Sequence, residues 1–198
     1  MEDFMQLQDD LDLNNAFEII VSNQNFTGVT NEIACLIKMN LATRDSIEKI
    51  LYKYQIRALT DLKEELLNLI LAYINIILQD HELTQKELRN LKQLKLLFHI
   101  QEGDFLKYRY KEMKEILHQQ LMPIYRNDNR IDDYESIFKV GLQELFTLGY
   151  DQFLKFANEE DKIALEKGAD ISDLDTVLSR SKLMKLESEI RHRISPRS

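Results

Sequence analysis

The chain has 198 residues, of which 44% are hydrophobic and 30% are charged, and its formal net charge is −8. These fractions are ordinary for a soluble globular protein, and the acidic balance argues against a nucleic-acid-binding protein. Two prolines and five glycines are too few for a turn-rich β-sandwich or barrel. The five glycines do not form the spacing of a glycine-rich phosphate-binding loop. The single cysteine, Cys35, excludes an intrachain disulfide and suits a reducing compartment, so we expect a cytoplasmic protein.

Helix-capping residues followed by apolar residues at helical spacing recur along the whole chain. They predict helices near 14–23, 30–39, 44–55, 61–79, 85–98, 104–126, 133–147, 151–167 and 173–193. No segment alternates apolar and polar residues as a half-buried strand does. We therefore expect an all-α helical bundle of about nine helices, folded as a single domain over residues 1–198. Gly103 and Gly149 stand where a helix ends in a residue of positive φ.

The most apolar stretch is residues 66–78, in which 11 of 13 positions are apolar. A bilayer-spanning helix needs about 20 such residues. This run is closed by charged or polar residues at both ends, so it predicts the buried central helix of a bundle, and we expect no transmembrane segment.

One acidic passage occurs twice, at an offset of 48 residues. Residues 80–87 read DHELTQKE and residues 128–135 read DNRIDDYE. The same offset superimposes two leucines and two phenylalanines of the following segment: Leu94 on Leu142, Leu97 on Leu145, Phe98 on Phe146 and Phe105 on Phe153. A repeat of this spacing indicates an internally duplicated helix–turn–helix unit.

Part of each acidic passage has the spacing of a capping box. Thr84 precedes Glu87 by three residues, and Asp132 precedes Glu135 by three. In such a box the first side chain accepts from the third amide of the helix, and the glutamate reaches back to the cap amide. The two glutamates are thereby explained without a ligand.

Capping does not explain Asp80 and Asp128. Each follows a predicted helix C-terminus, where the helix dipole disfavours a carboxylate, so each is expected to have a partner. The candidates are a loop amide, a lysine of the other repeat, or a cation. If the two units pack about a pseudo-twofold axis, Asp80, Glu87, Asp128 and Glu135 converge as oxygen ligands for Mg²⁺ or Ca²⁺.

The passage LAYINIILQDHELTQKELRNLKQLKLLFHI at 71–100, repeated more weakly at 121–153, resembles the TerB-like family of tellurite-resistance helical proteins. The resemblance covers about residues 61–156 and leaves an N-terminal helical extension, 1–60, and C-terminal helices, 157–198, outside it. The family pattern has Asp-Gly where this chain has Asp80-His81 and Asp128-Asn129. The resemblance implies an acidic metal site at Asp80, Glu87, Asp128 and Glu135 and roles in stress response or phage defence. It also implies that the chain binds another protein within a larger complex, sometimes at a membrane, and is not an enzyme.

A first alternative is a di-metal, ferritin-like enzyme. Glu115 with His118, and Glu189 with His192, have the spacing of the Glu-x-x-His pairs of di-iron helical bundles. Such a site needs further glutamates from two other helices, for which Glu64 or Glu144 can be nominated. The arginines on both sides of His192 oppose a metal cation there.

A second alternative is a helix-turn-helix regulator formed by residues 30–55. Its basic residues would be Arg44, Lys49 and Lys53, opposed by Asp45 and Glu48. A DNA-reading helix needs a basic face, so this pattern supports the alternative poorly. The leading prediction is therefore a non-enzymatic helical interaction or scaffold protein.

Overall fold

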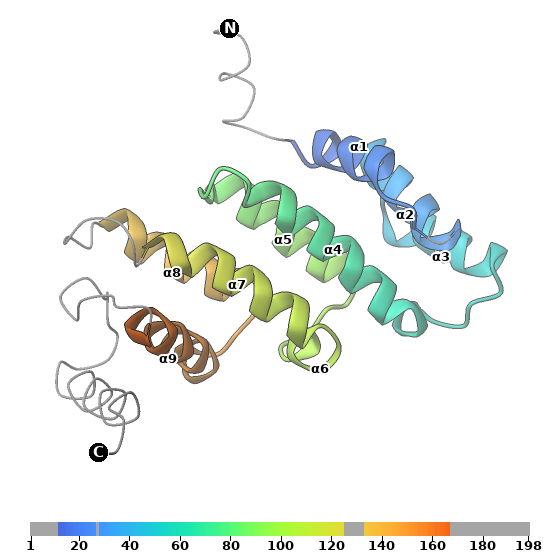
Figure 1. The fold of residues 1–198 in the computed structure, drawn as a ribbon. Coiled ribbons are helices and arrows are strands. Elements are labelled where there is room, and N and C mark those ends of the chain that lie inside the picture. The colour runs from blue at the N-terminus through green and yellow to red at the C-terminus, as the bar shows by residue number, and fades with distance from the viewer. Residues whose placement is uncertain (1–11, 27, 125–132, 167–198) are drawn as a thin grey trace, which may run out of the picture. The chain divides into compact units, whose positions relative to one another are not determined.

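The computed structural model describes residues 12–26, 28–124 and 133–166 (Figure 1). The chain divides into two compact units, residues 1–109 and 110–198. The division falls inside the stretch 61–156 that was expected to form one core. The described part of the first unit contains α1 (Leu13–Asn23), α2 (Gly28–Lys38), α3 (Arg44–Lys53), the 3-10 helix η1 (Leu59–Leu62), α4 (Lys63–Ile77), α5 (Gln85–Leu97) and α6 (Asp104–Tyr108). That of the second contains α7 (Tyr110–Ile124), α8 (Asp133–Leu145) and α9 (Tyr150–Glu166).

The described residues form only helices and no strand, which confirms the all-α prediction. Eight predicted helices match observed ones to within a few residues, apart from one that is divided; the helix predicted at 173–193 lies outside the described residues. No helix in the ranges described is long and apolar enough to cross a membrane, as expected for the 15-residue α4.

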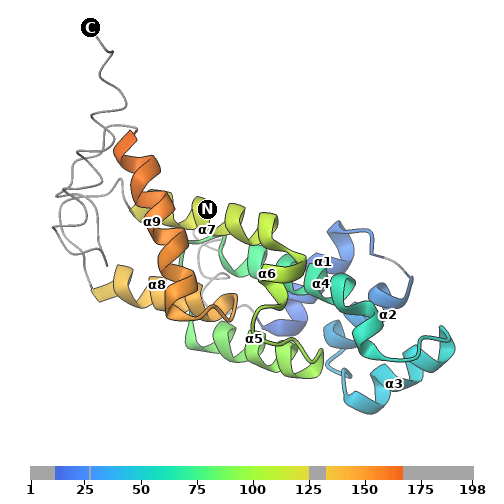
Figure 2. The ribbon, with the colours of Figure 1, turned by 90° about the horizontal axis from the view of Figure 1, so that it is seen from below.

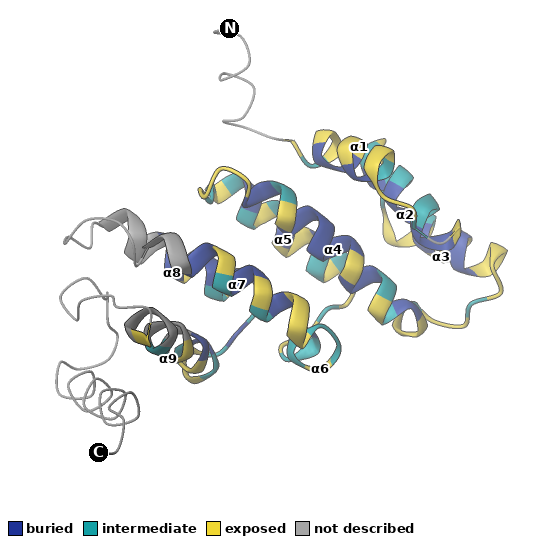
Figure 3. Ribbon diagram, viewed as in Figure 1, coloured by how far each residue is buried: buried dark blue, intermediate teal, exposed yellow. Residues whose placement is uncertain are grey.

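The first unit is built around α4, which packs against α1, α2 and α5 (Figures 1 and 2). Nine residues of α4 are buried: Leu66, Leu67, Leu69, Ile70, Leu71, Ala72, Tyr73, Ile74 and Ile77 (Figure 3). Such burial on several faces requires neighbours on more than one side, which the surrounding helices supply. The prediction of a buried central helix is confirmed.

In the second unit α7 packs against both α8 and α9. Its buried apolar side chains include Met113, Ile116, Leu117 and Leu121, at helical spacing along one face that also holds the buried Gln120. The ring of Tyr110 contacts the ring of Phe156 at a centroid distance of 5.8 Å, which links the start of α7 to α9.

The helix predicted over 104–126 is divided at Arg109, which has φ −139° and ψ 37° and separates α6 from α7. Apolar periodicity continues through this point, so the sequence pattern did not reveal the break. Its cause is long-range, because the Arg109 side chain is bonded to α4, more than 40 residues earlier in the chain.

Helix α5 and helix α8 end in the same way, 48 residues apart. His99 and Thr147 have φ of 51° and 53°, and the next amides donate to Lys95 O and Gln143 O, at 2.8 and 3.1 Å. This is a Schellman ending with a non-glycine residue in the left-handed position. Gly103 has the predicted positive φ, 83°, but it is the N-cap of α6 and does not end α5, where His99 is the left-handed residue. The prediction for Gly149 was wrong, since Thr147 takes the left-handed conformation there.

The likeness continues into the next helix. The amide of Gln101 donates to Asp104 Oδ2, and the amide of Gly149 donates to Gln152 Oε1, both at 2.8 Å. Each of these acceptors is followed by a buried phenylalanine. The second halves of the two predicted copies therefore share local geometry, while their duplication stays a prediction.

Candidate functional site

The turn after α4 holds Asp80 by local bonds. Asp80 is exposed, and its Oδ1 accepts a hydrogen bond of 2.9 Å from the amide of Glu82, two residues on. This is the hydrogen bond of an Asx turn. The loop amide, one of the three partners considered for Asp80, is thus present. His81 beside it has φ 60°, the conformation that a glycine adopts most easily.

Glu87 is the predicted helix cap and lies inside the first unit. Its Oε2 accepts from the Thr84 amide at 2.8 Å and from the Thr84 hydroxyl at 2.9 Å. The Glu87 amide donates to Thr84 Oγ1 at 3.2 Å, which completes the capping box. Only 6% of Glu87 is exposed, so this carboxylate is a structural part of the α4–α5 packing.

A buried polar group lies beside this cap. The Tyr73 hydroxyl and Asn90 Nδ2 are buried, and neither has a hydrogen-bond partner in the described part of the chain. Burial raises the pKa of Tyr73 well above its ordinary value, so the phenol stays neutral. This arrangement positions no charge for a ligand.

The other two predicted metal ligands, Asp128 and the side chain of Glu135, lie outside the described residues. Asp80 and Glu87 belong to the first unit, and Asp128 and Glu135 to the second. Within the described ranges, no three His, Cys, Asp or Glu side chains come together as a metal site would require.

The first Glu-x-x-His pair is on α7, where Glu115 is exposed and His118 is half-buried. The second, Glu189 and His192, lies outside the described residues. Glu64, which could have supplied a further ligand, is paired with Arg109 instead.

The basic residues of the helix-turn-helix alternative are largely neutralised by acids. Arg44 Nε lies 3.0 Å from Glu48 Oε1, four residues on. Lys53 donates to Glu32 Oε1, and the Tyr54 hydroxyl donates to the same oxygen at 2.7 Å. The hydrogen bond from Lys53 lowers the pKa of Glu32 and raises that of Lys53, so both stay charged at neutral pH. Little positive charge therefore remains on α3 for a phosphate backbone.

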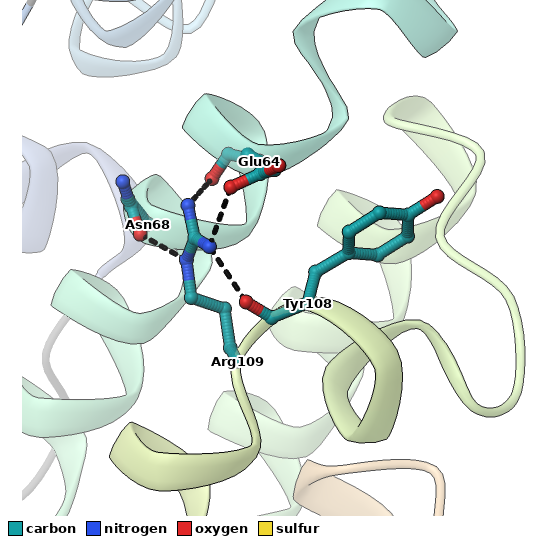
Figure 4. A network of polar contacts seen from close by, with 4 residues as sticks. All are labelled: Glu64, Asn68, Tyr108 and Arg109. Carbon is teal, nitrogen blue, oxygen red and sulfur yellow. Dashed lines mark hydrogen bonds and ion pairs between the residues drawn. The ribbon is translucent and has the colours of Figure 1, made fainter.

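Arg109 is the centre of a polar network at the N-terminal end of α4 (Figure 4). Its NH1 donates to Glu64 Oε2 at 2.9 Å, and its NH2 donates to the main-chain oxygen of Glu64 at 3.0 Å. Its Nε donates to Asn68 Oδ1, and its NH1 also donates to the main-chain oxygen of Tyr108, at 2.6 Å. A polar cavity of about 460 Å³ adjoins this network, but the Arg109 side chain is 11% exposed and four of its five N–H donors are used within the protein. The network joins the end of α6 to the start of α4 within the first unit.

A more apolar cavity of about 320 Å³ lies between α3, the segment 57–60 and the end of α5. We name it the α3–α5 groove; it is lined by Arg44, Ile47, Glu48, Leu51, Arg57, Ala58, Leu59, Thr60, Leu97 and His99. Residues 44, 47, 48 and 51 share one helical face of α3. His99 is held in the left-handed conformation, and its main-chain oxygen accepts from Lys63 Nζ at 2.7 Å, which fixes this edge of the groove.

The sequence prediction missed this groove. Its lining comes from three segments separated by helices, and no motif connects them. The exposed Arg57 in the linker between α3 and η1 was its only local signal.

Comparison of the chain with protein-family models, with curated proteins and with solved structures gave no match.

Proposed function

We propose that this chain is a non-enzymatic interaction module, and that the α3–α5 groove is the surface that binds its protein partner. The observation that supports this most strongly is the lining of the groove. Ile47 and Leu51 form an apolar floor, while Arg57 and His99 are exposed at the rim. Peptide-binding grooves combine an apolar centre with a polar rim in this way.

Exposed apolar side chains on the first unit support the same proposal. Leu96 on α5, next to the groove residue Leu97, is 69% exposed, and Tyr52 on α3 is 88% exposed. Single exposed apolar residues are common on any protein surface. These two support the proposal only because each lies on a helix that lines the groove.

Site-specific photo-cross-linking tests the proposal. A photoreactive amino acid replaces Ala58, an exposed lining residue, in cells that naturally produce the protein. The matched control position is Glu82, which is exposed in the α4–α5 turn and does not line the groove. We expect a discrete protein adduct from position 58 and none from position 82. No adduct from 58, or equal adducts from both, would contradict the proposal.

The TerB-like resemblance adds a setting to this proposal, namely a role in stress response or phage defence with a divalent cation bound through Asp80, Glu87, Asp128 and Glu135. Asp80 is the more accessible of the two described ligands, because Glu87 would have to leave its cap at a cost of about 1 kcal/mol. Thermal unfolding with and without Mg²⁺ or Ca²⁺ tests the cation. We expect a higher Tm with the ion, and no such rise in the Asp80→Asn, Asp128→Asn double variant. If neither ion changes the Tm of the unaltered chain, the proposal of a bound cation is refuted.

A further inference from the structure

The chemistry of the groove indicates what kind of partner segment it takes. We propose that the α3–α5 groove binds a short acidic segment of a partner protein, with aliphatic side chains on its floor and a carboxylate paired to Arg57. This inference rests on the proposed function and makes it specific.

The floor selects aliphatic side chains. The apolar residues that line the groove are Ile47, Leu51, Ala58, Leu59 and Leu97, all aliphatic, and no Phe, Tyr or Trp is among its lining residues. Its volume of 320 Å³ is at the lower end of the roughly 300–1,000 Å³ typical of ligand pockets. A few leucine- or isoleucine-sized side chains fill such a space, whereas a phosphate or another small anion would leave the apolar floor in water.

The rim selects negative charge. Arg44 is already paired with Glu48, whereas Arg57 is exposed and has no ion pair or side-chain hydrogen bond among the described residues. The lining residues carry two guanidinium groups and one carboxylate, on a chain whose net charge is −8. The Asp61 carboxylate lies beside them and accepts from the Ala58 amide at 3.2 Å. A guanidinium pairs with a carboxylate through two parallel hydrogen bonds, which makes Arg57 the specific anchor.

The acidic character of the whole chain does not cancel this local preference. At physiological ionic strength, charges separated by more than about 8 Å are largely screened, so the rim charges dominate at contact. Nucleic acid does not fit the same features. It would need a wide basic face, whereas Arg44 and Lys53 are paired with acids on the protein itself.

A displayed library of random 12-residue peptides, selected on the full-length protein, tests this inference. We expect the enriched peptides to combine Asp or Glu with Leu, Ile or Met. Arg57→Glu should weaken their binding at least tenfold. The matched control is Arg89→Glu, the same charge reversal at an exposed position of α5 that does not line the groove, and it should leave the Kd within twofold. Circular dichroism of both variants checks that they fold alike.

Three results would overturn the inference. These are enrichment of basic or of uncharged aromatic peptides, no enrichment at all, and acidic peptides whose binding ignores Arg57→Glu. Self-association that is lost in Arg57→Glu, seen by sedimentation, would assign the groove to a second copy of the chain and would also overturn it. A cross-link from position 58 together with any of these results leaves the interaction function standing and refutes only the acidic partner.

Discussion

Replacing Arg109 with alanine should weaken the first unit by about 3 kcal/mol. The guanidinium makes three hydrogen bonds to neutral oxygens, those of Glu64, Asn68 and Tyr108, and each contributes about 1 kcal/mol. The ion pair with the Glu64 carboxylate adds less than about 1 kcal/mol, because that side chain is 58% exposed and its charge is solvated. Arg109→Lys should recover less than half of the loss, since one ammonium cannot reach the acceptors on α4 and the Tyr108 oxygen of α6 together.

Amide hydrogen exchange of peptides from α4 and α6 measures this effect within the first unit. Protection of these amides should fall in Arg109→Ala by the factor that corresponds to the lost free energy, with an intermediate value in Arg109→Lys. Exchange that changes by less than tenfold in the alanine variant, or a lysine variant indistinguishable from the unaltered chain, would refute the role assigned to this network.

Three further substitutions test the packing. Gln55 is exposed and has φ 56°, a left-handed conformation that is strained for any residue except glycine. Gln55→Gly should therefore raise the free energy of unfolding, measured in urea titrations, by about 0.5–1 kcal/mol. A decrease would contradict this assignment. Tyr73→Phe should raise the free energy of unfolding of the chain by about 1 kcal/mol, because it removes a buried hydroxyl without a hydrogen-bond partner. A lower free energy of unfolding in the same titration would mean that the hydroxyl is hydrogen-bonded. Ile74→Asp should cost several kcal/mol and abolish cooperative thermal unfolding, while Asn75→Asp on the exposed face should not; equal Tm values would contradict the assigned burial.

The sequence predicted those parts of the fold that depend on local chemistry. Thr84 with Glu87 marked the start of α5 because a capping box needs only two residues three apart. The apolar run 66–78 indicated a buried helix because its length and composition leave few other interpretations. The break at Arg109 was missed because its cause lies in bonds to Glu64 and Asn68, which no local pattern records.

The site was harder to predict than the fold. Acidic residues in a repeated motif predicted a metal site. In the structure, the carboxylate of Glu87 caps α5 and that of Asp80 accepts a hydrogen bond within the turn after α4. The α3–α5 groove combines Ile47, Leu59 and Leu97, whose sequence neighbours give no sign of a shared surface. Such a site depends on how helices pack, and helix packing is only weakly encoded in spacing.

The central claim is that a partner protein occupies the α3–α5 groove, and the most direct measurement is the yield of the cross-link from position 58 in variants of the groove. Leu59→Glu places a charge on the groove lining and should abolish the adduct. Val140→Glu, on an exposed side chain of α8 that does not line the groove, should leave the yield unchanged. An adduct that persists in Leu59→Glu, or that both variants remove equally, would show that the partner binds elsewhere.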